Sequence, residues 1–446
     1  MTTDFSATLA AISDFVCGYP LFLTLIGGGL FLFITSRCIS LRCLPYSLSI
    51  IREHTNGSNG QISSLEALAS VVAATVGMGN IAGVAIALVM GGPGAIFWMW
   101  VSAFFGMSTI YAEAVMAQHT KVVENGTIVG GPVYYIKYIF KGKFGKFLAG
   151  FFSVAIILAL GFMGNMVQSN SIGAAFNNAF HVNPLVVGIV VAVVAGIIFL
   201  GGIKRIARVT EKVVPLMAFL YIIGCLIILV MRLPEVGHAF RDIFVGAFSP
   251  QSVAGGVLGV TVQKAMRYGV ARGLFSNEAG MGSTPHAHAT ADVENPCEQG
   301  IIAMMGVFID TFVILTLTAL VILSTGVLGN GLTGSELAQS AFQVGFGSFG
   351  KIFIAICMLF FAFTTIVGWY YFGEVNVRHL FGEKAIKLYG ILVVIFVVVG
   401  STLKVELVWN MSDMFNGLMV LPNLIALLAC IKTVLKITKD YEKKNK

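Results

Sequence analysis

The residues with the clearest capacity for ligand chemistry lie in one apolar stretch, 73–83, which reads Ala-Ala-Thr-Val-Gly-Met-Gly-Asn-Ile-Ala-Gly. Gly77 and Gly79 each weaken a helix by about 1 kcal/mol relative to alanine. In a membrane, backbone groups released from a helix persist only where they face protein or line a cavity. We therefore expect an interrupted helix whose open backbone binds a ligand.

The chemistry of such an interruption follows from helix polarity. Carbonyls at the end of the first half carry partial negative charge and suit a cation, whereas amides at the start of the second half suit a carboxylate. A zwitterion and a sodium ion need these two surfaces side by side. Asn80 can add an amide oxygen and Thr75 a hydroxyl. The alternative is close helix packing through Gly79 and Gly83, which leaves the two polar residues unexplained; the GxGxxxG spacing, with no preceding strand, does not fit a dinucleotide loop.

Further polar side chains lie in other apolar segments. Gln168 belongs to a polar cluster, 164–170, and either faces a cavity or bonds to a neighbouring helix. Thr364 and Thr365 offer adjacent hydroxyls, followed by Trp369, although threonines often bond back to their own helix.

Ionisable residues in or beside apolar segments are functional candidates by default. They are Glu66, Glu113, Lys264, Arg267, Arg272, Glu278, Asp310, Glu374 and Asp413. Arg272 with Glu278 or another acid is a hypothetical gate. His286 and His288 have no third ligand in spacing, which disfavours a metal site.

The elements that position these residues are membrane helices. The 446-residue chain is 57% hydrophobic and 11% charged, with mean hydropathy +0.89, against about a quarter charged residues in soluble proteins. Several windows approach the ~20 apolar residues that a span needs. The composition predicts an all-α polytopic membrane protein. Scattered cysteines without CxxC spacing favour neither a metal site nor a disulfide framework, and no organic cofactor is expected.

We expect eleven spans, with the longest inner loop, 119–146, either an amphipathic surface element or an ordinary structured loop. The spans are 18–36, 64–90, 94–118, 147–178, 184–202, 210–232, 253–290, 298–326, 349–376, 385–403 and 407–433. Most of the 28 Lys and Arg residues then follow odd-numbered spans. The positive-inside rule predicts a plasma (inner) membrane protein with its N-terminus outside and its C-terminus cytoplasmic. The net charge of +7 thus reflects topology and not nucleic-acid binding.

Two of the expected spans are abnormal. Span 64–90 contains the interrupted stretch, and span 253–290 is too long and carries glycines within 272–282. If the first span is set aside, spans 64–90 and 253–290 are the first and sixth of ten helices, and so hold the same position in two halves of five. A matched pair of glycine-interrupted helices indicates a transporter built from inverted repeats. We therefore expect one transmembrane domain, residues 1–446, with an extra N-terminal helix and five-helix repeats at 64–232 and 253–433.

The stretch 91–106, Gly-Gly-Pro-Gly-Ala-Ile-Phe-Trp-Met-Trp-Val-Ser-Ala-Phe-Phe-Gly, resembles the signature of the alanine/glycine:cation symporter family. The resemblance extends to 73–83, 164–172 and 275–283, and so covers most of the chain. This sequence has His286 where the family more often has apolar residues.

The resemblance implies the leucine-transporter-type fold and Na⁺-driven uptake of alanine or glycine, with H⁺ in some members. It implies a substrate site made of Thr75, Gly77, Gly79, Gln168, Phe275, Ser276, Asn277 and Trp369. Sodium is expected on the carbonyls of Ala73 and Val76 and on the hydroxyls of Thr364 and Thr365. Asn80 is expected to serve a second cation or the substrate carboxylate.

We predict a secondary active transporter, not an enzyme, that carries a small neutral amino acid with Na⁺ by alternating access. Phe275 and Trp369 are expected to limit the side chain it accepts. Coupling to H⁺ is the alternative. A channel would need a continuous polar pore, and no nucleophile–base or metal set supports a membrane enzyme. The expected partners are the amino acid, Na⁺ and membrane lipid, with the oligomeric state open.

Overall fold

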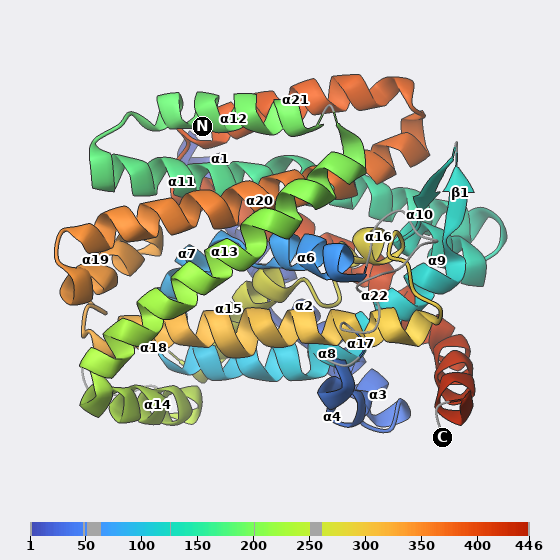
Figure 1. Ribbon diagram of the computed structural model, residues 1–446, viewed down its shortest axis with the longest axis horizontal. Coiled ribbons are helices and arrows are strands. Elements are labelled where there is room, and N and C mark those ends of the chain that lie inside the picture. Colours follow the sequence, from blue (N-terminus) through green and yellow to red (C-terminus); the bar gives the residue numbers. More distant parts are fainter. Residues whose placement is uncertain are drawn as a thin grey trace.

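The computed structural model describes residues 2–47, 50, 64–124, 126–199, 201–249 and 261–444, nearly all of them helical (Figure 1). The elements are α1 (Thr2–Val16), α2 (Tyr19–Phe22), η1 (Leu23–Gly27), α3 (Gly28–Thr35), α4 (Ile39–Cys43), η2 (Leu44–Tyr46), α6 (Ser64–Thr75), η4 (Met78–Asn80), α7 (Ala82–Gly91), α8 (Gly94–Thr120), β1 (Val122–Glu124), β2 (Thr127–Val129), α9 (Pro132–Ile139), α10 (Gly142–Ile156), η5 (Ile157–Gly164), α11 (Asn165–Phe180), α12 (Pro184–Phe199), α13 (Gly202–Met231), α14 (Leu233–Phe248), α15 (Val262–Asn277), α16 (Pro285–His288), α17 (Pro296–Val307), η7 (Phe308–Leu315), α18 (Thr316–Ser324), α19 (Gly334–Phe346), α20 (Phe349–Phe381), α21 (Lys384–Gly400) and α22 (Val405–Lys444).

Seven helices within the described residues are long and apolar enough to cross a membrane, which confirms a multi-pass, all-helical membrane protein. They are Ala11–Thr35, Gly94–Thr120, Gly142–Phe180, Arg205–Met231, Pro296–Ser324, Phe349–Phe381 and Val405–Lys444. The four remaining expected spans are shorter or interrupted, at α6/α7, α12, α15/α16 and α21. The count of eleven and the two five-helix repeats stay predictions.

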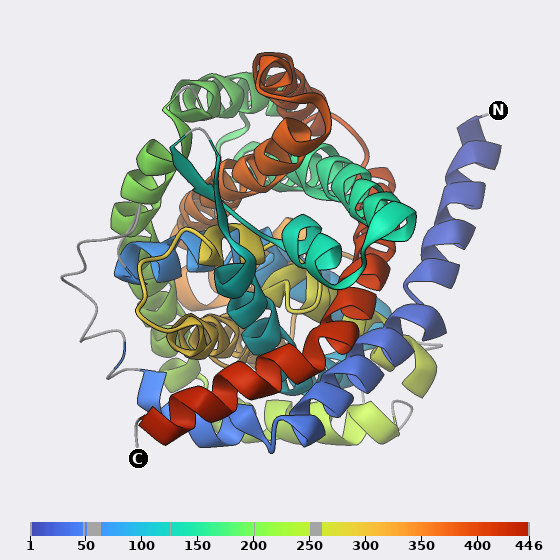
Figure 2. The same cartoon turned by 90° about the vertical axis from the view of Figure 1, so that its right-hand side faces the viewer.

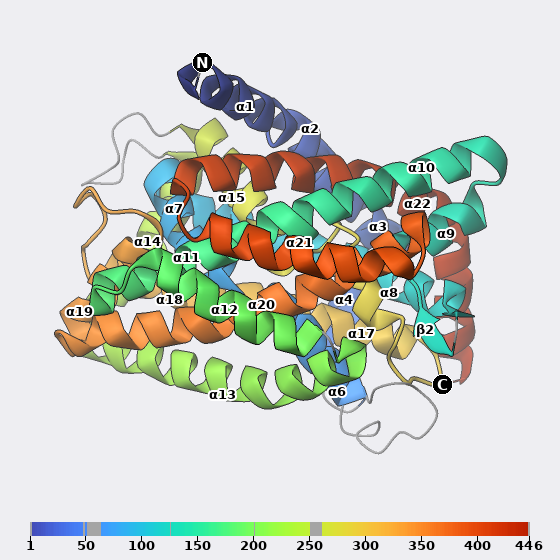
Figure 3. The ribbon, with the colours of Figure 1, turned by 90° about the horizontal axis from the view of Figure 1, so that it is seen from above.

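The first expected span is formed by α2, η1 and α3, which pack on α8 and α22. The preceding α1 packs on α22, and its N-terminal end protrudes from the bundle (Figures 2 and 3). The assignment of this segment as an extra helix outside two repeats stays a prediction.

The two interrupted helices lie at the centre of the bundle, inside the longer helices (Figure 2). α6 packs against α13, α17 and α20, while α7 packs against α15 and α19. α15 lies against α7 and α8. Backbone released at either interruption therefore faces protein, as membrane burial requires.

The second interrupted segment differs in extent from the expected span 253–290. Residues 253–260 lie outside the described part, and α15 continues through 272–277, the first residues of the glycine-containing stretch 272–282. The helix ends at Asn277, and only the four-residue α16 follows the loop 278–284. The break therefore starts at Glu278.

The segment 119–146, expected to be an inner loop, is structured. An antiparallel hairpin, β1–β2, leads into α9, which packs on α8, α10 and α22. Tyr135 and Ile136 of α9 are fully buried. α9 therefore packs against the helical bundle, and its position relative to the membrane surface stays a prediction.

Candidate functional site

The first break, 76–80, redirects the backbone hydrogen bonds of α6. In a continuous helix the amide of Gly77 would donate to the carbonyl of Ala73. Here it donates to Thr75 O at 2.9 Å and Asn80 Oδ1 at 3.1 Å. The carbonyl of Ala73 thus loses its helical donor, and Thr365 Oγ1 donates to it from α20 at 3.1 Å.

Gly77 is glycine because two side chains crowd its backbone. A Cβ at this position would lie 2.5 Å from Thr365 Oγ1 and 3.4 Å from Gln168 Nε2. Gln168 Oε1 accepts a hydrogen bond from the amide of Met78 at 3.3 Å. Its Nε2 is buried and has no hydrogen-bond partner within the described residues. The side chain therefore presents a free donor at the break, as an acceptor such as a carboxylate requires.

The two adjacent threonines of α20 face different neighbours, because successive helical residues point about 100° apart. Thr365 contacts α6, whereas Thr364 Oγ1 donates to Phe360 O at 2.9 Å and lies 3.7 Å from Met217 Sδ on α13. The structure thus brings Thr365 to the break but directs Thr364 away from it. Sodium binding by Thr364 and by the carbonyl of Val76 stays a prediction.

The second break uses left-handed backbone. Glu278, Gly280 and Gly282 all have positive φ, a conformation that glycine adopts without strain. From α8, the Glu113 carboxylate accepts hydrogen bonds from the amides of Gly280 at 3.4 Å and Gly282 at 3.0 Å. Asn423 Nδ2 donates to the same carboxylate at 2.6 Å. A buried acid therefore anchors the loop that replaces the helix.

A second acid fixes the aromatic wall of the site. Trp369 Nε1 donates to Glu278 Oε1 at 2.6 Å, and the Ser283 hydroxyl donates to the other carboxylate oxygen. The indole meets the Phe275 ring edge-on, with centroids 5.4 Å apart. The two rings predicted to limit substrate size therefore do lie together.

Arg272 pairs with Asp413 of α22, not with Glu278. Its Nη1 donates to Asp413 Oδ1 at 2.9 Å, and Nη2 contacts Oδ2. The guanidinium also stacks 4.0 Å from the Trp409 ring centroid, a cation–π geometry. The hypothesised gate is thus an ion pair between α15 and α22. Its acid, Asp413, lies 141 residues from Arg272 in the sequence.

The two breaks meet at Gly79, Ser276 and Asp310. A Cβ on Gly79 would lie 3.2 Å from both Phe275 Cδ1 and Ser276 Cα. Asn80 Nδ2 donates to Asp310 Oδ1 at 2.7 Å, and Ser276 Oγ donates to the same carboxylate. Both polar groups of the Asn80 side chain are therefore hydrogen-bonded to protein, to the Gly77 amide and to Asp310. The sequence shows Asp310 only as an acid in an apolar segment, because packing brings its partners to it from elsewhere in the chain.

Two other predicted substrate residues have their polar groups engaged by protein. Asn277 donates to Thr311 Oγ1 at 3.2 Å and accepts from the amide of Ala279 at 3.1 Å. Thr75 Oγ1 donates to the carbonyl of Val71 at 3.0 Å. Both lie beside the breaks, and their contact with substrate stays a prediction.

The paired histidines after the second break face different partners. His286 Nε2 lies 2.9 Å from Asn376 Nδ2, and His288 Nδ1 lies 2.8 Å from Gln299 Nε2. Across the described ranges, no three His, Cys, Asp or Glu side chains are placed to hold a metal ion.

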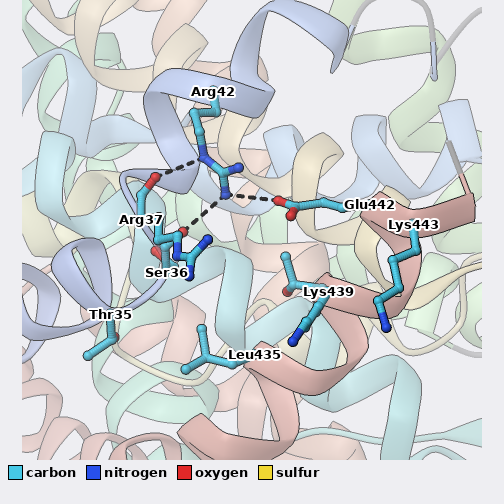
Figure 4. Close-up of a pocket in the computed structure, with 9 residues that line it drawn as sticks. Thr35, Ser36, Arg37, Arg42, Leu435, Lys439, Glu442 and Lys443 are labelled. Carbon is cyan, nitrogen blue, oxygen red and sulfur yellow. Dashed lines mark hydrogen bonds and ion pairs between the residues drawn. The ribbon is translucent and has the colours of Figure 1, made fainter. Parts of the chain in front are cut away.

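A pocket also opens far from the breaks, between the N-terminal segment and the end of α22 (Figure 4). Its Arg42 pairs with Glu442 at 2.9 Å and donates to the carbonyls of Arg37 and Ser36 (Figure 4). These contacts join the α3–α4 segment to the C-terminal end of α22. The groups predicted to bind substrate and ion lie elsewhere, at the buried breaks.

Solved transporter structures share this fold. The chain aligns with MhsT in complex with L-phenylalanine at a TM-score of 0.60 and 15% identity, covering 85% of this chain and 100% of MhsT. A Na⁺-coupled sialic acid symporter aligns at 0.54 and 14% identity, covering 86% and 82%. At these identities the likeness concerns the fold alone, the leucine-transporter type.

Sequence relatives are much closer. The sodium/alanine symporter AgcS of Methanococcus maripaludis is 41% identical, over 98% of this chain and 97% of that protein. The amino-acid carrier protein AlsT of Bacillus subtilis is 40% identical, over 100% and 94%. A probable sodium/glutamine symporter, GlnT of Bacillus subtilis, is 39% identical. The model of the sodium:alanine symporter family matches residues 2–446. The chain therefore belongs to the sodium:alanine symporter family.

Proposed function

We propose that this transporter carries alanine or glycine into the cell together with Na⁺. The observation that carries the proposal is the composition of the first break. The Ala73 carbonyl has lost its helical donor and accepts a hydrogen bond from the Thr365 hydroxyl. That hydroxyl and the unpartnered Gln168 Nε2 donor both lie next to Gly77. One short segment thus offers an oxygen surface for a cation and a donor surface for a carboxylate.

Sodium would bind at the end of α6. The carbonyls of Ala73 and Val76 and the hydroxyls of Thr365 and Thr364 are neutral oxygen donors, which suit a hard cation. In the present arrangement the Thr365 hydroxyl donates a hydrogen bond to the Ala73 carbonyl. With Na⁺ bound, both oxygens would coordinate the ion. The C-terminal dipole of α6 adds negative potential at the same point.

The amino acid would bind with its carboxylate toward Gln168 and the start of α7, at Gly77 and Gly79. The substrate side chain would face Phe275 and Trp369, with Ser276, Asn277, Thr75 and Asn80 completing the surroundings. These two rings, packed edge-on, would limit the substrate side chain to a small group. One relative is named as a probable sodium/glutamine symporter, so the preference for alanine or glycine is the part of the proposal that a competition experiment must test first.

Alternating access would move the two breaks relative to the surrounding helices. In this scheme residues 64–232 and 253–433 are the two repeats, in a protein with eleven spans, an outside N-terminus and a cytoplasmic C-terminus. Coupling to H⁺ in place of Na⁺ is the second candidate, favoured by the buried acid Asp310 between the breaks.

The proposal is tested by uptake into proteoliposomes. Labelled alanine should accumulate when Na⁺ is higher outside, and should only equilibrate when Na⁺ is equal on both sides. Excess unlabelled glycine should compete, and a long-chain amino acid should compete less. Accumulation that is indifferent to every cation gradient would contradict symport.

A further inference from the structure

The pocket between the α3–α4 segment and the end of α22 has the composition of an anion site. Its volume of about 380 Å³ lies within the ~300–1,000 Å³ of small-ligand pockets. The walls come from the turn after α3 and from the last turns of α22 (Figure 4). The charged side chains that line it are four cations and one acid: Arg37, Arg42, Lys439, Lys443 and Glu442. The proposed transport uses none of them.

Only one of these cations is neutralised by protein. Arg42 Nη2 lies 2.9 Å from Glu442 Oε1. Within the part of the chain that the structure describes, no ion pair involves Arg37, Lys439 or Lys443. Lys439 and Lys443 are four residues apart, so they share one face of α22, and Figure 4 shows both extending from the same side of the helix. The pocket therefore carries an excess of positive charge that an anion would offset.

Both walls of the pocket are held in place without an anion. Arg37 and Cys38 have left-handed backbone, with φ of 57° and 59°, which is uncommon for residues other than glycine and persists where surrounding contacts hold it. The Arg42 guanidinium supplies such a contact by donating to the Arg37 carbonyl at 2.8 Å. On the other wall, the Thr438 hydroxyl lies 2.9 Å from the Tyr111 hydroxyl of α8. A ligand would thus meet a largely preorganised site.

The surroundings of the pocket favour a lipid over a free anion. Ile34 and Leu41, which are 63% and 58% exposed, directly precede the lining residues Thr35 and Arg42. The last turns of α22 cross the end of the bundle (Figure 2), on the side that the positive-inside rule predicts to be cytoplasmic. Headgroups lie at that level of a membrane, and basic pockets between transmembrane helices on that side bind anionic headgroups.

We propose that this pocket binds the phosphate of an anionic phospholipid. Arg37, Lys439 and Lys443 would donate charge-assisted hydrogen bonds to the phosphate oxygens, and the acyl chains would lie against exposed apolar side chains such as Ile34. A lipid bound in this way joins the α3–α4 segment to α22 and stabilises the folded protein. The proposal is independent of which amino acid and which cation the protein transports.

The test is thermal unfolding of the purified protein in a neutral detergent. Dioctanoyl phosphatidylglycerol should raise the melting temperature in a saturable way, because a ligand that binds only the folded state stabilises it. Dioctanoyl phosphatidylcholine, whose headgroup has no net charge, should not. Lys439→Gln/Lys443→Gln removes two unpaired cations and should raise the lipid concentration for half-maximal effect by about tenfold or more.

The matched control is Lys432→Gln/Lys436→Gln. These two exposed lysines lie on the same helix but do not line the pocket. Both double variants lose the same charge, so a general attraction of anionic lipid to a positive surface affects them alike. The control should keep the wild-type response to phosphatidylglycerol. Without lipid, both variants should melt at the wild-type temperature, because substitutions of exposed side chains have small effects on stability.

Two further probes separate a lipid from a free phosphate. Inorganic phosphate and glycerophosphoglycerol, the headgroup without its acyl chains, offer the pocket a phosphate but no apolar part. At the concentration where phosphatidylglycerol saturates, both should leave the melting temperature unchanged. An equal shift by either probe would make the pocket a site for a free phosphate and overturn the proposal.

Other outcomes also overturn it. An equal response to phosphatidylcholine and phosphatidylglycerol does so in the wild type alone, whatever the variants do. An equal loss of response in the two double variants would assign the effect to the charge of the C-terminal surface as a whole. If Lys439→Gln/Lys443→Gln does not fold, Arg37→Gln replaces it, and a wild-type response in Arg37→Gln contradicts the proposal.

Discussion

The two interrupted helices occupy the same central part of the bundle but are built differently. The first joins helices of 12 and 10 residues through the short turn η4. The second follows a 16-residue helix with a loop and the four-residue α16. Asn80 and Gln168 hold the first break with neutral groups. Two carboxylates, Glu113 and Glu278, hold the second.

This difference has a physical cause. After the first break, α7 resumes at once, so few amides lose their partners and amide side chains suffice. After the second break the amides of Gly280 and Gly282 have no helical acceptors, and a buried carboxylate is the stronger acceptor. The first break thus contains one buried donor without a partner in the described residues, Gln168 Nε2, and one carbonyl, that of Ala73, whose donor is a side chain and not the helix. The second is committed to protein contacts that position Phe275 and Trp369.

The largest effect should come from closing the first break. Gly77→Ala places a Cβ 2.5 Å from Thr365 Oγ1, and the helix–helix contact must shift. We expect sodium-driven alanine uptake to fall to background. Gly83→Ala is the matched control, because its Cβ would lie 3.6 Å from the Trp409 ring, an ordinary contact. Equal uptake by the two variants would remove Gly77 from the site.

Glu113→Ala should have the next largest effect, on stability. It leaves the amides of Gly280 and Gly282 without their acceptor, at about 1–3 kcal/mol for each buried unsatisfied group, whereas Asn423 Nδ2 keeps the carbonyl of Gly280 as an acceptor. The melting temperature of the purified protein should fall clearly. Glu113→Gln keeps one acceptor oxygen and should lose less. A wild-type melting temperature for Glu113→Ala would show that the second break needs no carboxylate.

Gln168→Ala should weaken alanine binding by roughly tenfold or more, because a hydrogen bond to a charged group contributes about 1.5–3 kcal/mol. Equilibrium binding of labelled alanine measures this change. The control is Asn170→Ala, whose amide bonds to the carbonyls of Gly400 and Leu403 instead. Unchanged affinity in Gln168→Ala would assign that side chain to packing.

Thr365→Val should produce the smallest of these effects. It removes one neutral oxygen ligand, at about 1 kcal/mol, and should raise the Na⁺ concentration for half-maximal uptake by about fivefold. Thr364→Val, which faces α13, should raise it less. If Thr364→Val has the larger effect, the ion lies on the other side of α20 from the one proposed.

The first break could be predicted from the sequence because its chemistry is local: Gly77, Gly79 and Asn80 are anomalous within an apolar run. Gln168 and Thr365 stood out for the same reason. The partners of charged residues could not be predicted, because packing brings them together across the chain. Arg272 meets Asp413, 141 residues away, and Glu113 binds backbone amides, which carry no mark in the sequence. Nor did the pattern predict that α16 would be only four residues long.

The central claim is that one break binds the cation and the amino acid side by side. The most direct test is the equilibrium affinity of the purified protein for alanine at increasing Na⁺ and constant ionic strength. Because each ligand completes the surroundings of the other, alanine should bind more tightly as Na⁺ rises, and alanine should tighten Na⁺ binding by the same factor. An alanine affinity that stays constant from Na⁺-free buffer to saturating Na⁺ would contradict the claim.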